Sequence, residues 1–172
     1  MTDHDMDTLE SYQQTLIQAY PELRVRSAHL NTQGQNSYVL IVNDQYVFRF
    51  PRYAHVLQQL KTETALLKHI RPRLPLPVPN PEFVHLDDQP IGQAFQGYRM
   101  IAGAPLWRET FQAIGDDAVL EALAGQLAGF LRALHNIPVG QMPGGLVLPK
   151  GAKLQPNPQK SIKAITMARA GD

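Results

Sequence analysis

Arg49 and Glu63 are the residues of this sequence whose types and spacing could most clearly do chemistry. Arg49 stands in the segment QYVFRF, where it alternates with Tyr46, Phe48 and Phe50. In a β-strand this alternation places the three aromatic side chains on one face and Arg49 on the other. A guanidinium on the inner face of a small sheet needs an anion, because a buried unpaired charge is costly. That anion could be a carboxylate, a phosphate or both.

The segment after this strand supplies a carboxylate. Apolar residues recur at helical spacing over residues 56–70, and Glu63 lies beside this stripe, between Leu60 and Leu67. The spacing predicts that Glu63 reaches Arg49. A basic residue on a strand and a glutamate on the following helix position phosphates in protein-kinase-like folds, where the cation is usually lysine. Arginine can also bind phosphate and carboxylate in a bidentate manner. From the pair alone, a structural ion pair is favoured over a nucleotide site by roughly two to one.

The elements that must position this pair are predicted to form a sheet of about five strands in an α+β fold. Asn43-Asp44 favours a hairpin turn between strands at 37–42 and 45–50. Apolar patterns predict further strands at 23–30, 82–86 and 94–101. A helix capped by Asp7 or Thr8 precedes them and stops at Pro21. The Glu63 helix is inserted between the third and fourth strands.

Two connections around these elements have distinct compositions. The loop 31–36 contains one glycine, Gly34, and could place backbone N–H groups over phosphates. One glycine is a weak signal, and an ordinary turn is the simpler interpretation of this loop on its own. The prolines between Pro72 and Pro81 are predicted to exclude helix and to favour an extended connector.

The strongest helical pattern lies over residues 117–135, after a hinge-like break at 102–106. This helix is predicted to be capped by Asp116 or Asp117. Its leucines form one stripe, made of Leu120, Leu123, Leu127, Leu131 and Leu134. A stripe this regular is a core face, so it needs partner elements to bury it.

Composition and charge narrow the class of protein. The 172 residues are 44% hydrophobic, which fits one globular domain with a core. The net charge of +1 gives no argument for a nucleic acid partner. The absence of cysteine excludes disulfides, thiolate metal sites and cysteine nucleophiles. The N-terminal stretch lacks a secretory signal and no window is apolar enough to span a membrane, so the sequence predicts a cytoplasmic protein.

Several stretches and their order together resemble the aminoglycoside phosphotransferase family, which is related to the protein kinases. The matching stretches are YVFRFPR, TETALLKHI, LPLPVPNPEFV, FQGYRMIAGAPL and LAGQLAGFLRALHNIP. The likeness covers about residues 10–140 and is greatest to the branch that modifies a 2''-hydroxyl. It implies a protein-kinase-like N-lobe over 1–101, a hinge and first C-lobe helix over 102–138, and a divergent, poorly ordered tail over 139–172. It also reverses the preference for a merely structural ion pair.

The resemblance further implies a site for ATP or GTP with Mg²⁺. Arg49 takes the place of the residue that contacts the phosphates, and Glu63 that of its helix partner. Tyr98 lines the back of the base pocket, and Ser37 lies in the loop over the phosphates. The backbone C=O of Arg99 and the N–H of Ile101 bond the edge of the base. The family's acceptor is a hydroxyl of an aminoglycoside or a similar small molecule.

The sequence departs from the family in the residues that perform the transfer. The family places a His-x-Asp loop, an Asn and an Asp-x-Gly-like turn after the helix that here ends at His135. In this sequence no His follows His135, and no Asp lies between Asp117 and Asp172. We therefore expect a truncated, inactive form without the catalytic base or the metal ligands. The alternative is a non-catalytic nucleotide-binding or interaction module whose Leu120 to Leu134 face is covered by a partner chain. A third alternative is a structural α+β domain with an inert ion pair.

Overall fold

A computed structural model describes residues 8–104 and 106–138 of the chain. The elements up to the end of the second long helix are α1 (Leu9–Ala19), β1 (Ala28–Asn31), β2 (Ser37–Val42), β3 (Tyr46–Pro51) and α2 (Ala54–Ile70). They are followed by η1 (Arg71–Arg73), β4 (Pro81–His85), β5 (Phe95–Arg99), α3 (Arg108–Gln112) and α4 (Asp117–His135). The segment 139–172, for which we predict a divergent tail, lies outside the described residues.

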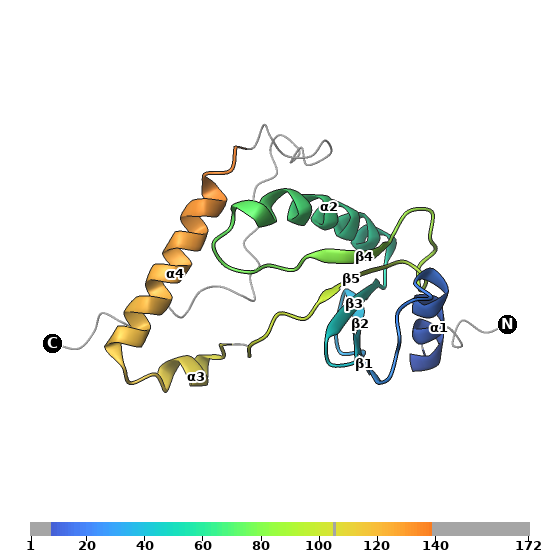
Figure 1. Cartoon of the computed structure of the whole chain (residues 1–172), viewed down its shortest axis with the longest axis horizontal. Helices are drawn as coiled ribbons and strands as arrows, with labels where there is room; N and C mark the ends of the chain where they lie inside the picture. Colours follow the sequence, from blue (N-terminus) through green and yellow to red (C-terminus); the bar gives the residue numbers. More distant parts are fainter. Residues whose placement is uncertain (1–7, 105, 139–172) are drawn as a thin grey trace.

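The strands form one antiparallel five-stranded sheet in the order β1-β2-β3-β5-β4. The sheet lies between α1 and α2 (Figure 1). Because side chains alternate along a strand, Phe48 and Phe50 of β3 leave the sheet toward α1, while Arg49 leaves it toward α2. The predicted α+β fold, with about five strands and a helix inserted after the third, is confirmed.

Aromatic side chains fill the space between the sheet and α1. Phe48, Phe50 and Phe95 are fully buried there with Tyr12 and Leu16 of α1. The rings of Tyr12 and Phe50 have centroids 4.5 Å apart, an ordinary distance for a favourable aromatic pair. This core holds the strand that carries Arg49 on its other face.

Gly97 of β5 lets the ring of Phe48 lie directly against the strand. A Cβ atom at this position would collide with that ring. The close approach explains a glycine in the middle of a strand, where it otherwise weakens the ladder.

The predicted hairpin turn is confirmed at Asn43 and Asp44, whose φ angles are 55° and 53°. Positive φ at both central residues matches the twist of a tight hairpin, and Asn and Asp tolerate it. The side chain of Asn43 also binds the segment before β1. Its Oδ1 accepts from the N–H groups of Arg26 and Ser27, and its Nδ2 donates to the C=O of Arg24.

This side-chain contact explains why the predicted strand at 23–30 is too long. The observed strand is Ala28–Asn31, because the preceding backbone bonds to the Asn43 side chain instead of to a neighbouring strand.

The structure differs from the sequence-based expectation in two smaller ways. Pro72 lies in the short helix η1, where proline is tolerated in the first turn. The short helix α3 lies between the hinge and α4, where the sequence analysis predicts no element.

The helix α4 is observed where it was predicted, with Asp116 as its N-cap accepting from the N–H of Ala118. None of its residues is buried. Figure 1 shows α3 and α4 set apart from the sheet, joined to it through the segment after β5. None of the helices within 8–104 and 106–138 combines the length and the apolarity needed to cross a membrane.

Candidate nucleotide-binding site

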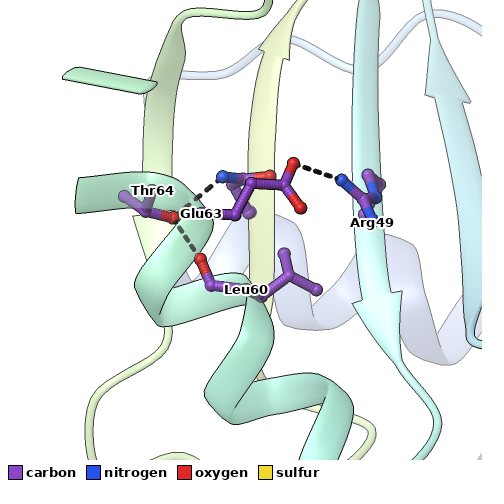
Figure 2. A network of polar contacts seen from close by, with 5 residues as sticks. Arg49, Leu60, Glu63 and Thr64 are labelled. Carbon is purple, nitrogen blue, oxygen red and sulfur yellow. Dashed lines mark hydrogen bonds and ion pairs between the residues drawn. The ribbon is translucent and has the colours of Figure 1, made fainter. Parts of the chain in front are cut away.

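Arg49 and Glu63 meet across the face of the sheet that α2 covers (Figure 2). Nη1 of Arg49 donates to Oε1 of Glu63 over 2.6 Å, as the spacing predicted. The two side chains keep 29% and 36% of their area exposed. The pair is therefore formed but remains open to solvent on one side. A third group could reach the guanidinium there.

The local sequence explains how α2 brings its carboxylate to this place. Val56, Leu60 and Leu67 are buried on the sheet side of the helix. Val56 and Leu60 pack in a cluster with Leu86 and Ala94. Glu63 lies beside this buried stripe, so its side chain runs along the edge of the interface toward β3.

A second polar link, which was not predicted from the sequence, joins α2 to the sheet. Nε2 of Gln96 on β5 donates to Oγ1 of Thr64 over 2.8 Å, and this Oγ1 donates to the C=O of Leu60 over 2.7 Å. Gln96 is 0% exposed and Thr64 is 6% exposed. The signal in the sequence was a glutamine between Phe95 and Gly97 in the strand predicted at 94–101.

Tyr98 lies next to the ion pair. It is the cross-strand partner of Val47, two residues before Arg49, and it is half-buried. Burial raises the pKa of the Tyr98 hydroxyl, while Arg49 lowers it and Glu63 raises it. The phenol is thus within the electrostatic range of both members of the pair and is held in its neutral form.

The strand β5 ends in a segment whose backbone groups alternate in direction. The N–H of Met100 donates to the C=O of Gln45, the residue just before β3, over 2.7 Å. In an antiparallel ladder the groups of the neighbouring residues then point to the opposite side. The C=O of Arg99 consequently faces away from β3. The N–H of Ile101, two residues past the end of β5, makes no backbone hydrogen bond within the described chain. These two groups are one acceptor and one donor at the hinge end of β5.

Ser37 does not lie in the loop where the resemblance located it, because it is the first residue of β2. Its side chain is buried, and among the described residues its Oγ has no hydrogen-bond partner. The loop before it is fastened by Arg52, which donates from Nη1 to the C=O of Gly34 and from its backbone N–H to the C=O of Asn36. A Cβ at Gly34 would collide with the C=O of Ser37, so the loop turns back tightly here.

Other features lie away from this site. A cavity of about 480 Å³ is lined by residues of the segment 22–27 and of the hairpin turn, and it includes neither Arg49 nor Glu63. We do not regard it as the place where a nucleotide binds, because its lining contains neither the ion pair nor Arg99 and Ile101 at the end of β5. In the part of the chain that the structure describes, no group of three or more acidic or histidine side chains could hold a metal ion.

The sheet, the helix that brings a glutamate to a basic strand residue, and the hinge after β5 define the N-lobe of a kinase-like protein. The sequence model of the phosphotransferase enzyme family (APH) matches residues 27–160, so the chain belongs to this family. The resemblance inferred from the sequence is confirmed. A comparison with curated proteins gave no match.

Solved structures of aminoglycoside phosphotransferases share this fold. The GDP and kanamycin complex of APH(2")-IIIa has a TM-score of 0.67 at 28% identity, over 75% of this chain and 42% of that one. The GDP complex of a variant of aminoglycoside 2'-phosphotransferase IIIa has a TM-score of 0.70 at 26% identity, over 77% and 43%. The ternary complex of streptomycin, ATP and APH(2")-IIa, at 20% identity and a TM-score of 0.62 over 81% and 41%, supports the fold alone. The chain spans less than half the length of these proteins.

Proposed function

We propose that this chain is the nucleotide-binding lobe of an aminoglycoside phosphotransferase-like protein and that it binds a purine nucleoside triphosphate. The observation that carries the proposal is the Arg49–Glu63 pair, formed at 2.6 Å yet open on one side. An ion pair with only a structural role gains nothing from this exposure, whereas a phosphate-binding arginine requires it. In this proposal the N-lobe comprises residues 1–101, and residues 102–138 form the hinge and the first helix of the C-lobe.

Arg49 binds the phosphates, and Glu63 orients it. A guanidinium has five N–H donors, and the contact with Glu63 uses one on Nη1. The remaining donors can bind phosphate oxygens in the bidentate manner that arginine favours. Ser37 lies at the base of the loop that would cover the phosphates, and its Oγ has no hydrogen-bond partner among the described residues.

The base lies against the same face of the sheet, nearer the hinge. Ile41, Val47 and Tyr98 are half-buried cross-strand neighbours on β2, β3 and β5. Together they offer an apolar surface for the flat face of a purine. The C=O of Arg99 and the N–H of Ile101 then bond its edge. Backbone groups of this kind suit both ATP and GTP, and two neighbouring proteins were solved with GDP.

The acceptor in this proposal is a hydroxyl of an aminoglycoside, since a neighbouring protein was solved with kanamycin. We infer that the 172-residue chain does not complete the transfer by itself. Its sequence has no His after His135 and no Asp between Asp117 and Asp172, so the family's base is missing. The described residues also do not fit Mg²⁺, because they lack a cluster of carboxylates. A nucleotide-dependent role agrees with the cytoplasmic location that the sequence predicts.

Calorimetry with ATP, GTP and the corresponding nucleosides tests the proposal. We expect Arg49→Met to weaken triphosphate binding about tenfold or more, because charged hydrogen bonds to phosphate are lost. Nucleoside binding should stay unchanged. Lys61→Met is the matched control, since Lys61 is a cation of α2 that pairs with the exposed Asp87. No binding by the wild type, or equal affinities of wild type and Arg49→Met, would contradict the proposal. A phosphotransfer assay with aminoglycosides should show no turnover.

A protein-interaction module is the second candidate, and the exposed face of α4 favours it. Leu127 is 57% exposed and Leu131 is 40% exposed on this helix. Contiguous apolar surface of this kind marks interfaces. Sedimentation of the pure chain distinguishes the candidates: a concentration-dependent association that Leu127→Glu abolishes would support an interface, and a monomer at all concentrations would count against it.

A further inference from the structure

We propose that Gln96 is a positioning residue: through Thr64 it fixes α2 against the sheet so that Glu63 holds Arg49 ready for phosphate. The inference rests on the proposed nucleotide-binding function and adds to it a part of the site that touches no ligand. The observation behind it is a buried polar link that runs beside the exposed ion pair (Figure 2).

The two links join the same places on α2 and the sheet. Arg49 of β3 and Gln96 of β5 are cross-strand partners, so their side chains leave the sheet as neighbours on one face. Glu63 and Thr64 are successive residues of α2. The Arg49–Glu63 contact of 2.6 Å and the Gln96–Thr64 contact of 2.8 Å therefore lie side by side between one turn of the helix and one rung of the sheet.

The directions of the hydrogen bonds fix the orientation of the glutamine. The hydroxyl of Thr64 has one proton, and it donates this proton to the C=O of Leu60. It can therefore only accept from Gln96, and the amide must turn its Nε2 toward the helix. Oε1 of Gln96 is left buried with no partner among the described residues. An apolar side chain would avoid that unpaired oxygen, so packing alone does not account for a glutamine at this position.

The difference in burial gives the two links different roles. Gln96 and Thr64 are 0% and 6% exposed, whereas Arg49 and Glu63 are 29% and 36% exposed. Water and phosphate can compete for the guanidinium, but neither can reach the amide. The buried link thus keeps α2 in place while the exposed pair changes partners.

The apolar contacts of α2 cannot fix the rotation of the helix against the sheet as closely as a hydrogen bond does. Leucine and valine side chains tolerate small rotations of a helix, whereas a hydrogen bond weakens steeply when its geometry changes. A rotation by one residue would turn Thr62 or Thr64 toward Arg49 in place of Glu63. Neither threonine carries the charge that pairs with a guanidinium, so the register of α2 decides whether the pair forms.

The test compares Gln96→Leu and the nearly isosteric Thr64→Val with Thr62→Val, an exposed threonine on the other side of Glu63. We expect the first two variants to raise the Kd for ATP or GTP about three- to tenfold, the range of one hydrogen bond. The Kd for the nucleoside should stay within about twofold. Thr62→Val should change neither. In a Glu63→Gln background the effect of Gln96→Leu should disappear, because there is no pair left to position.

Two outcomes would overturn the inference: equal weakening of nucleoside and triphosphate binding, or the same effect of Gln96→Leu with and without Glu63.

A measurement without nucleotide distinguishes failure of the positioning role from failure of the proposed nucleotide-binding function. In proton–nitrogen spectra, the paired guanidinium of Arg49 should give separate Nη resonances because its rotation is hindered. Gln96→Leu and Thr64→Val should merge them, and Thr62→Val should not. If the wild type binds no nucleotide but the resonances merge, the positioning role stands without the proposed ligand; unchanged resonances contradict it.

Discussion

The sheet with α1 and α2 differs from the α3–α4 region in how its apolar pattern is used. Phe48, Phe50 and Phe95 are completely buried between the sheet and α1. On α4, whose leucine stripe is the most regular in the sequence, no residue is buried and Leu127 is 57% exposed. Trp107, just before α3, is 65% exposed. Regular periodicity thus specifies an apolar face on a helix, while the burial of that face depends on a partner element. Among the described residues, α4 has no such partner.

This difference bears on the candidate site. Every residue that we assign to nucleotide binding, from Ser37 to Ile101, lies on the sheet, on α2 or at the end of β5. These elements bury one another and need no contact from α4. The binding part is therefore expected to be stable and preformed without the rest of a second lobe, whereas α4 contributes little to its stability.

The largest expected effect comes from one truncation in each region. Phe48→Ala should lower the free energy of unfolding by about 3–5 kcal/mol, because it leaves a cavity in a fully packed aromatic cluster. Leu127→Ala should change it by less than about 0.5 kcal/mol, since that side chain is mostly exposed. Urea unfolding followed by circular dichroism measures both values. Similar losses for the two variants would mean that α4 is packed in solution, so that the two regions would not differ in burial.

A smaller effect is expected from the two helix caps. The side chain of Thr8 accepts from the N–H of Ser11 at the start of α1, and Asp116 accepts from Ala118 at the start of α4. Thr8→Ala should reduce global stability by about 1 kcal/mol, because α1 unfolds together with the core that it covers. Asp116→Ala should only destabilise α4 locally.

Hydrogen exchange distinguishes these two results. Asp116→Ala should speed exchange of α4 amides and leave the urea midpoint of the sheet unchanged. Thr8→Ala should instead shift that midpoint. If Asp116→Ala shifts the midpoint as much as Thr8→Ala does, the two regions unfold as one unit.

The sequence predicted those features that depend on local period and turn chemistry. Alternation put Arg49 opposite the aromatic residues, helical spacing put Glu63 beside the buried stripe, and Asn43-Asp44 predicted the hairpin. The observed contact of 2.6 Å confirms that the first two patterns combine into a pair. Each of these inferences needs only neighbours within one turn or one strand.

Features that depend on distant partners could not be predicted in this way. Gln96 and Thr64 meet only because β5 pairs with β3 in one register and α2 packs on that face. The short β1 depends on the Asn43 side chain, which takes the backbone bonds that a longer strand would have used. In the first case a side chain remote in sequence adds a contact that the local pattern does not indicate. In the second case it takes hydrogen bonds that the local pattern would assign to a strand.

The smallest effect, and the most specific to the candidate site, concerns Tyr98. Burial raises the pKa of its hydroxyl above the ordinary value of 10.0, Arg49 lowers it and Glu63 raises it. The folded state therefore retains the phenol proton to higher pH than the unfolded state does. The resulting stabilisation is fully present below pH 10.0 and is lost as the pH rises through the folded-state pKa. Tyr98→Phe should flatten this alkaline loss in urea unfolding above pH 10.0, and absorbance of tyrosinate should show one fewer late-titrating group. Since Arg49 opposes the shift, Arg49→Met should move the titration of Tyr98 to still higher pH. A titration of Tyr98 that does not respond to Arg49→Met would mean that the phenol and the ion pair do not share one site.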